Sequence, residues 1–192
     1  MRPSGRLALW LGLVGVLLGS RAASQTLAPG PPGPFVIDVR GTTSGIPSGT
    51  GLYPTLSEGA SVPARGFGVD VGGHVYPVRL GPARVGVGIN FIYVRGTSVD
   101  AHATVQTIAP QISINFGTAD GWSYLSAGLG TARVRAGASV SVQSLNAGGG
   151  ARWFLNRHVG LGFDVRLHKL SAEGTTMPAA TLVSTAVGFS LK

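Results

Sequence analysis

The sequence predicts an all-β protein, an eight-stranded antiparallel transmembrane β-barrel with up-and-down meander topology. The first observation is an alternation of large apolar with small or polar residues, clearest from Val159 to Leu167. A period of two is that of a strand with one apolar and one polar face. The second is an N-terminus with the layout of a secretion signal. The third is that long and short connections alternate between the expected strands.

Residues 1–24 have the three zones of a signal peptide. Arg2 and Arg6 give a positive start, an apolar core follows, and small residues precede an expected cleavage before Gln25. The apolar core has about a dozen residues, too few to span a bilayer as a helix. We therefore expect export and removal of this segment.

The rest of the chain divides into a leader at 25–34 and a barrel domain at 35–192. The leader is rich in proline, which fixes φ and lacks a backbone donor, so we expect it to be extended. Most expected strands reach the roughly 9–11 residues that a tilted strand needs to cross the apolar layer. They are 35–43, 66–78, 85–96, 104–117, 122–135, 143–155, 159–170 and 182–192.

The expected connections alternate in length. The short ones are 79–84, 118–121 and 156–158, and the long ones are 44–65, 97–103, 136–142 and 170–181. Membrane barrels have short periplasmic turns and longer external loops, and an even strand count returns both ends to the periplasm. This parity favours a membrane barrel over a soluble lipocalin-like barrel, and the low charge content argues the same way.

Composition narrows the function classes. Arg2, Arg6 and Arg21 carry three of the +8 formal charges, which leaves +5 for the remainder. The basic residues are scattered, which argues against nucleic-acid binding. Charged residues make up 11%, well below the roughly 25% of soluble domains. The chain has no cysteine, so disulfides, thiolate metal sites and a lipoprotein anchor are excluded. The histidines lack metal-ligand spacing, and we expect no metal or other cofactor.

The inward faces of the expected strands carry a polar cluster. An eight-stranded barrel is just wide enough for side chains to fill, so we expect a largely plugged polar interior. Inward glycines leave room for water or a narrow path. Arg152 and Asp164 face the same turn on adjacent strands, which predicts a direct or diagonal ion pair. The expected interior cluster is Asp38, Arg40, Asp70, His74, Arg152, Asp164, Arg166 and His168.

Cations and aromatic residues are expected at the two membrane surfaces. Trp122, Tyr124, Trp153 and Tyr93 fit aromatic girdles, although aromatic residues favour strands in any case. Guanidinium groups suit phosphate oxygens, so rim cations are candidates for contact with lipopolysaccharide. These are Arg65, Arg95, Arg133, Arg135 and Lys169. The loop 44–65 is either a contact surface for an extracellular ligand or a mobile connection.

Three stretches carry a family resemblance: YLSAGLG at 124–130, NAGGGARWFLNRHVGLGFDVRLH at 146–168 and VSTAVGFSLK at 183–192. They resemble the bacterial opacity-protein (opacity-like porin) and OmpA-like eight-stranded barrels. The resemblance implies a Gram-negative outer-membrane protein that contacts outer-membrane lipid and is inserted by the barrel-assembly machinery. That family commonly ends in an aromatic residue, and Lys192 departs from this pattern. Its functions are mixed, so the resemblance adds little biochemistry.

The expected function is a non-enzymatic barrel with a structural or surface-interaction role; the alternatives are a narrow pore for small solutes and a lipid A-modifying enzyme. Lipid A deacylases of this fold use a His and a Ser two residues apart with an acid. The nearest string here holds His168, Ser171 and Glu173. A spacing of three puts His168 and Ser171 on opposite faces of a strand, so we expect no catalytic residues.

Overall fold

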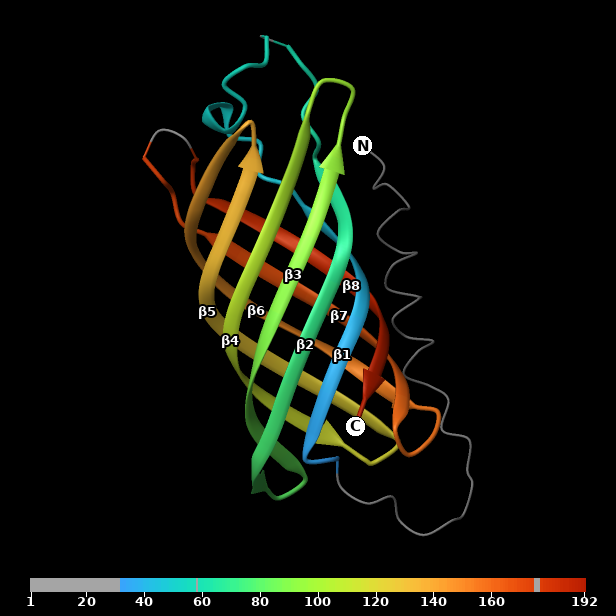
Figure 1. The fold of residues 1–192 in the computed structure, drawn as a ribbon. Helices are drawn as coiled ribbons and strands as arrows, with labels where there is room; N and C mark the ends of the chain where they lie inside the picture. The colour runs from blue at the N-terminus through green and yellow to red at the C-terminus, as the bar shows by residue number, and fades with distance from the viewer. Residues whose placement is uncertain (1–31, 58, 175–176) are drawn as a thin grey trace, which may run out of the picture.

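Eight antiparallel strands close into one barrel in the computed structural model, which describes residues 32–192 apart from 58 and 175–176 (Figure 1). The expected signal peptide and most of the leader lie outside the described residues. The strands are β1 (Phe35–Gly45), β2 (Arg65–Leu80), β3 (Ala83–Thr97), β4 (His102–Gly117), β5 (Gly121–Ala136), β6 (Ala138–Phe154), β7 (Val159–Leu170) and β8 (Ala180–Leu191). A short 3₁₀ helix, η1 (Thr50–Leu52), lies between β1 and β2. In the described part of the chain, no helix has the length and apolar character to cross a membrane.

Each strand pairs with its neighbours in sequence, and β8 closes the barrel against β1. Closure pairs Ile37 with Leu191 and Ser44 with Ser184. The expected eight-stranded meander is confirmed. Because the strand number is even, β1 begins and β8 ends at the same end of the barrel, the lower end in Figure 1.

The connections define two ends. The end with connections 81–82, 118–120 and 155–158 is called the turn end, and the end with 46–64, 98–101, Gly137 and 171–179 is called the loop end. The expected long loop at 136–142 is wrong. Its alternating residues continue the ladder to Ala136 paired with Ala138, and Gly137 turns the chain with φ of +84°. Glycine adopts this left-handed conformation without the strain of a Cβ atom.

The outer wall toward the turn end is apolar on every strand. One such residue from each strand is Val39, Val71, Ile89, Ile112, Leu125, Leu145, Val165 and Val187. We call this surface the belt. Ile112 is 65% exposed, whereas Asn115 on the inward face of the same strand is fully buried. The wall is thus apolar outside and polar inside, as a barrel in lipid requires.

Toward the loop end this pattern reverses. On β4, Val105 points inward and is buried, while Thr104 and Gln106 point outward. On β5, Ala132 and Val134 are buried. The outward Arg133 and Arg135 beside them are exposed. We call this part of the barrel, polar outside and apolar inside, the head.

On β3 to β6 the reversal follows one row of paired residues. Ile108 on β4, the first belt residue of its strand, pairs with Thr131 on β5, and Thr131 pairs with Gln143 on β6. Phe91 on β3 pairs with Ile108 and continues the same row. We call Phe91, Ile108, Thr131 and Gln143 the boundary row. On these four strands, the change of the outer wall from apolar to polar marks where lipid ends and water begins.

The lumen of the head is closed by an apolar cap. Leu52 of η1 and Met177 of the β7–β8 connection are fully buried, and Tyr53 is nearly so. They pack with inward residues of the head, among them Val94 and Val134. Burial in this cluster raises the pKa of the Tyr53 phenol. The described residues of 46–64 therefore cover the loop end of the lumen.

Candidate functional site

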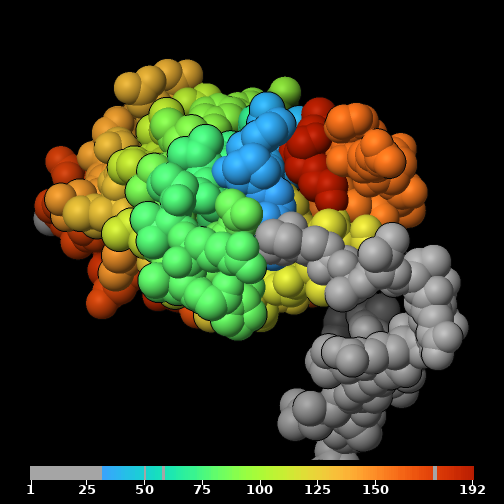
Figure 2. Space-filling model, turned by 90° about the horizontal axis from the view of Figure 1, so that it is seen from below, coloured from blue at the N-terminus to red at the C-terminus, as the bar shows by residue number. Residues whose placement is uncertain are grey.

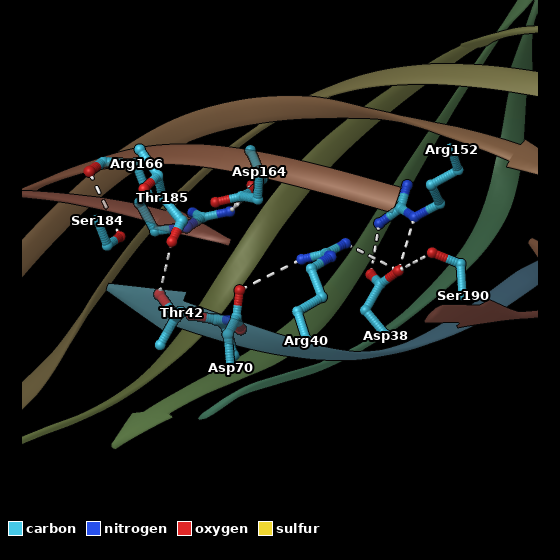
Figure 3. A network of polar contacts seen from close by, with 12 residues as sticks. Asp38, Arg40, Thr42, Asp70, Arg152, Asp164, Arg166, Ser184, Thr185 and Ser190 are labelled. Carbon is cyan, nitrogen blue, oxygen red and sulfur yellow. Dashed lines mark hydrogen bonds and ion pairs between the residues drawn. The ribbon is translucent and has the colours of Figure 1, made fainter. Parts of the chain in front are cut away.

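All eight residues of the expected interior cluster lie inside the barrel and are buried. Asp38, Asp70 and Asp164 oppose Arg40, Arg152 and Arg166, so the three carboxylates and three guanidinium groups balance (Figure 3). All six charged groups lie on the turn-end side of the head. A buried charge is tolerated when it is paired and hydrogen-bonded, and each of these six groups is.

Asp38 is the most heavily bonded carboxylate. Arg152 donates to it through both arms of its guanidinium, with Nε–Oδ1 at 2.9 Å and Nη2–Oδ2 at 2.6 Å. Ser190 Oγ donates to Oδ1 at 2.6 Å, and Arg40 Nη2 lies 2.8 Å from the same oxygen. Figure 3 shows Asp38 between Arg40 and Arg152. A two-armed arginine–carboxylate pair fixes both position and orientation.

Asp70 continues this network from β2. Its Oδ2 lies 3.3 Å from Arg40 Nη1, and its Oδ1 accepts a hydrogen bond from Asn90 Nδ2 at 2.5 Å. Arg40 thus bridges Asp38 and Asp70. Strands β1, β2 and β3 are tied together through these side chains.

Asp164 belongs to a second group of contacts. Its Oδ2 accepts from Tyr124 Oη at 2.7 Å and from Arg166 Nη2 at 3.0 Å. Arg166 also donates to Asn146 Oδ1 and Ser126 Oγ, each at 2.9 Å. This group joins β5, β6 and β7.

The predicted ion pair between Arg152 and Asp164 is wrong. Among the ion pairs of the described residues, Arg152 pairs with Asp38 and Asp164 pairs with Arg166. Tyr124 lies between the predicted partners, because the Arg152 guanidinium lies 3.8 Å from the centre of its ring while its hydroxyl donates to Asp164. The arginine therefore turns across the lumen toward β1.

The two interior histidines occupy separate places. His74 Nε2 lies 3.1 Å from Gln111 Oε1, and Gln111 in turn donates to Asn146. His168 Nε2 lies 3.2 Å from Ser184 Oγ inside the lumen. Ser171, by contrast, is exposed and donates to the Gln143 carbonyl. The structure does not bring His168 and Ser171 together.

The room beside two inward glycines is taken by the backbone of the neighbouring strand and by side chains. A Cβ atom on Gly148 would lie 2.9 Å from Cβ of Arg166, and one on Gly150 would lie 2.9 Å from Oη of Tyr124. These glycines let Tyr124 and Arg166 lie against the wall. The expectation of space for a narrow path is wrong at these two positions.

Two of the expected girdle residues point inward. Trp122 and Tyr124 are buried, because they share the inward parity of Ser126 on β5. Trp153 is exposed on the outer wall and stacks on Phe163, and Tyr93 is half-buried on the outer wall of the head.

Trp122 belongs to an aromatic cluster at the turn end with Tyr76 and Phe154. The Lys192 amino group lies 3.8 Å from the Phe154 ring centre and donates to the Ala119 carbonyl, and burial lowers its pKa. Figure 2 views this end, with the start of β1, the end of β8 and the turns drawn side by side.

All five expected rim cations are exposed on the outer wall toward the loop end. Arg95 and Arg135 lie in one row, because both pair with Thr104, one from each side. Arg133 pairs with Gln106 one step nearer the belt. Lys169 pairs with Leu145 on β6 and lies apart from these arginines.

Several residues that hydrogen-bond within the lumen were not among the predicted interior cluster: Tyr124, Ser126, Asn146, Asn90, Gln111 and Ser190. Their inward parity was readable from the alternation, but their partners were not. In the described residues, no group of three His, Cys, Asp or Glu side chains is arranged to hold a metal ion. The cluster is a balanced set of charges that are hydrogen-bonded to one another and to neighbouring polar side chains.

No family model matches the chain, and no curated protein matches it. Solved structures do. Neisserial surface protein A (NspA) is 15% identical with a TM-score of 0.59, covering 83% of this chain and 97% of its own. Ail, the attachment invasion locus protein of Yersinia pestis, is 14% identical with a TM-score of 0.54, covering 82% and 96%. It is also solved with the heparin analogue sucrose octasulfate. The outer membrane enzyme PagL is 16% identical with a TM-score of 0.50, covering 82% and 99%.

These likenesses cover nearly all of each solved chain and agree with the closed eight-stranded meander and its apolar belt. The expected fold class and outer-membrane type are confirmed. This chain has the fold of the small eight-stranded β-barrels of bacterial outer membranes.

Proposed function

We propose that the protein is a non-conducting, non-enzymatic outer-membrane barrel that holds a closed head above the membrane as a structural or surface-contact element. The observation that carries this proposal is that the lumen is filled at two levels. The interior cluster and its hydrogen-bond partners, which we call the lower plug, fill the lumen within the belt. The apolar cap fills the lumen within the head.

The lower plug is strong because it engages every strand. Asp38 on β1 is bonded from Arg152 on β6 and Ser190 on β8. His74 on β2 and Gln111 on β4 connect to the group around Asn146. Ion flow would require several of these bonded pairs to open together, and each opening leaves a buried charge unpaired.

A pore is the first alternative, and an enzyme is the second. The fold does not decide between them, since PagL is an enzyme with the same architecture. Against catalysis, His168 and Ser184 form the nearest Ser–His contact, and both are buried in the lumen between the plug and the cap. A lipid substrate in the membrane has no route to them through a wall of paired strands.

A surface-contact role places the partner at the loop end. Ail, which shares the fold, is named for attachment and is solved with a heparin analogue. In this chain the described residues of 46–64 and 171–179 form the top of the head. A rigid cap offers a fixed surface to an extracellular ligand, and binding to it would not require opening of the lumen. Insertion by the barrel-assembly machinery belongs to the same proposal.

Planar-bilayer recording of the folded full chain tests the plug. We expect no stable conductance steps from the native protein. The double variant Asp38→Ser with Arg152→Ser removes the central ion pair of the lumen without leaving either charge alone, and heat-modifiable gel migration checks that it is folded. Steady single-channel conductance from the native protein would overturn the proposal in favour of a pore. Removal of acyl chains from lipid A by the native protein, read by mass spectrometry, would overturn it in favour of an enzyme.

A further inference from the structure

The outer wall of the head carries a concentration of arginine on β3 and β5, the two strands that flank β4. Arg95 on β3 and Arg135 on β5 flank Thr104 in one row, and Arg133 flanks Gln106 in the next row toward the belt. Neighbouring strands lie about 4.8 Å apart, so the Cα atoms of Arg95 and Arg135 are roughly 10 Å apart. Two long guanidinium side chains at this separation can converge on one group placed over Thr104.

No acidic side chain offsets these charges on the wall. The eight strands carry three carboxylates, Asp38, Asp70 and Asp164, and all three are buried in the lumen. Among the described residues, no ion pair involves Arg95, Arg133 or Arg135. Arg133 makes one long hydrogen bond, 3.4 Å, to Ser141 Oγ. The wall therefore presents unneutralised positive charge to whatever lies outside it.

The arginines border a hollow in this wall. A groove of about 310 Å³ is lined by Arg95, Arg135, Thr104, Gln106, Tyr93 and His102, with neighbouring backbone. Its lining offers guanidinium, hydroxyl, amide and imidazole groups beside one aromatic ring. This donor set suits oxyanions with attached sugar better than an apolar ligand.

The height of the groove identifies the kind of ligand. Arg133 lies two residues above the boundary row and Arg135 lies four residues above it. At about 3.4 Å per residue along tilted strands, these positions are roughly 5 and 10 Å above the apolar layer. The headgroup layer of a bilayer occupies this zone.

We propose that the groove on β3–β5 binds the phosphate groups of a phosphorylated glycolipid of the outer leaflet, with Arg95 and Arg135 clasping a phosphate over Thr104 and Arg133 contacting the lipid side. This inference rests on the membrane placement in the proposed function. It narrows the five rim cations to three. Arg65 on β2 lies two residues beyond the Arg95 row toward the loop end and does not line the groove, and Lys169 on β7 is separated from the groove by β6. The lipid would act as a fixed annular partner on one side of the barrel.

The test measures binding of two lipids to the folded full chain in detergent by native mass spectrometry. The probes are bisphosphorylated lipid A and the same lipid with both phosphates removed. We expect the native protein to retain the phosphorylated form preferentially. The double variant Arg95→Gln with Arg135→Gln should weaken that binding by roughly tenfold and leave binding of the dephosphorylated lipid unchanged. The matched control is Arg79→Gln with Lys169→Gln, which removes two exposed charges away from the groove and should bind like the native protein.

The remaining outcomes are decisive as well. Equal retention of both lipids, or equal loss in the control variant, would overturn the proposal. Complete displacement of lipid A by equimolar inorganic phosphate would show that the groove takes a free anion instead of a lipid headgroup. Tighter binding of a sulfated oligosaccharide than of lipid A, lost in the double variant, would assign the groove to a glycan. Failure in any of these ways leaves the conductance test of the plug unaffected.

Discussion

Arg152 on β6 donates two hydrogen bonds to Asp38 on β1, at 2.9 and 2.6 Å, across the lumen between strands that are not neighbours. This pair links two distant parts of the wall and stands at the centre of the lower plug. The two-armed contact holds the arginine in one orientation, over the ring of Tyr124.

Asp38→Asn should destabilise the barrel strongly. The substitution leaves Arg152 buried with a neutral partner and Arg40 with Asp70 as its remaining carboxylate, at a cost of about 3–5 kcal/mol. Urea unfolding of the protein refolded into lipid vesicles measures this free energy. Ser190→Ala, which removes one hydrogen bond to the same carboxylate, is the matched control and should cost about 1 kcal/mol. A loss of unfolding free energy below 1 kcal/mol for Asp38→Asn would show that the Asp38–Arg152 pair is not needed for stability.

Gly150→Ala should be destabilising by about 1–3 kcal/mol, because the added methyl group meets Tyr124 Oη at 2.9 Å and the Phe163 carbonyl. The control is Gly73→Ala on β2, where a Cβ atom would have nothing within 4 Å. We expect the free energy of unfolding of the control to lie within about 0.5 kcal/mol of that of the native protein. Similar stability of both variants would mean that the lumen can relax around Gly150.

Leu52→Ala should behave as a core substitution although Leu52 lies in a connection between strands. Its side chain is fully buried in the cap, so the cost should be about 2–4 kcal/mol. Leu56→Ala is the control. We expect it to lower the free energy of unfolding by less, because Leu56 is only partly buried at the edge of the same cluster. The readout is the midpoint of thermal unfolding together with protease cleavage within 46–64. Unchanged stability and rapid cleavage in the native protein would contradict a packed cap.

The alternation of residues was enough to predict the strand number, the meander and the facing of nearly every belt residue. It succeeded because a period of two assigns each side chain to a face without knowledge of its partner. The alternation does not predict which side chains pair with one another inside the lumen. Adjacent strands suggested Asp164 for Arg152, but the lumen is narrow enough for an arginine to reach the opposite wall, where Asp38 accepts both arms.

The misassigned loop at 136–142 has a different cause. Ser139, Val140, Ser141 and Val142 alternate as well as any belt strand, but with the apolar residues inward. We expected the outward face of every strand to be apolar, as in lipid. This segment was not recognised as a strand because its outward face is polar and its inward face is apolar, as in a barrel in water. The same reversal was readable at Gln106 and Ile108, both outward on β4, where the outer wall changes from polar to apolar.

Spin labels placed one at a time along β6 test whether the outer wall changes from apolar to polar at the boundary row. The chain has no cysteine, so each label is unique. In outer-membrane vesicles, labels at Ser141 and Gln143 should be accessible to a water-soluble nickel relaxant, and labels at Leu145 and Ala147 should be accessible to oxygen in the lipid. A label at Val142 should be shielded from both, because that side chain is buried in the head. Lipid accessibility at Ser141, or nickel accessibility at Val142, would contradict a closed head above the membrane.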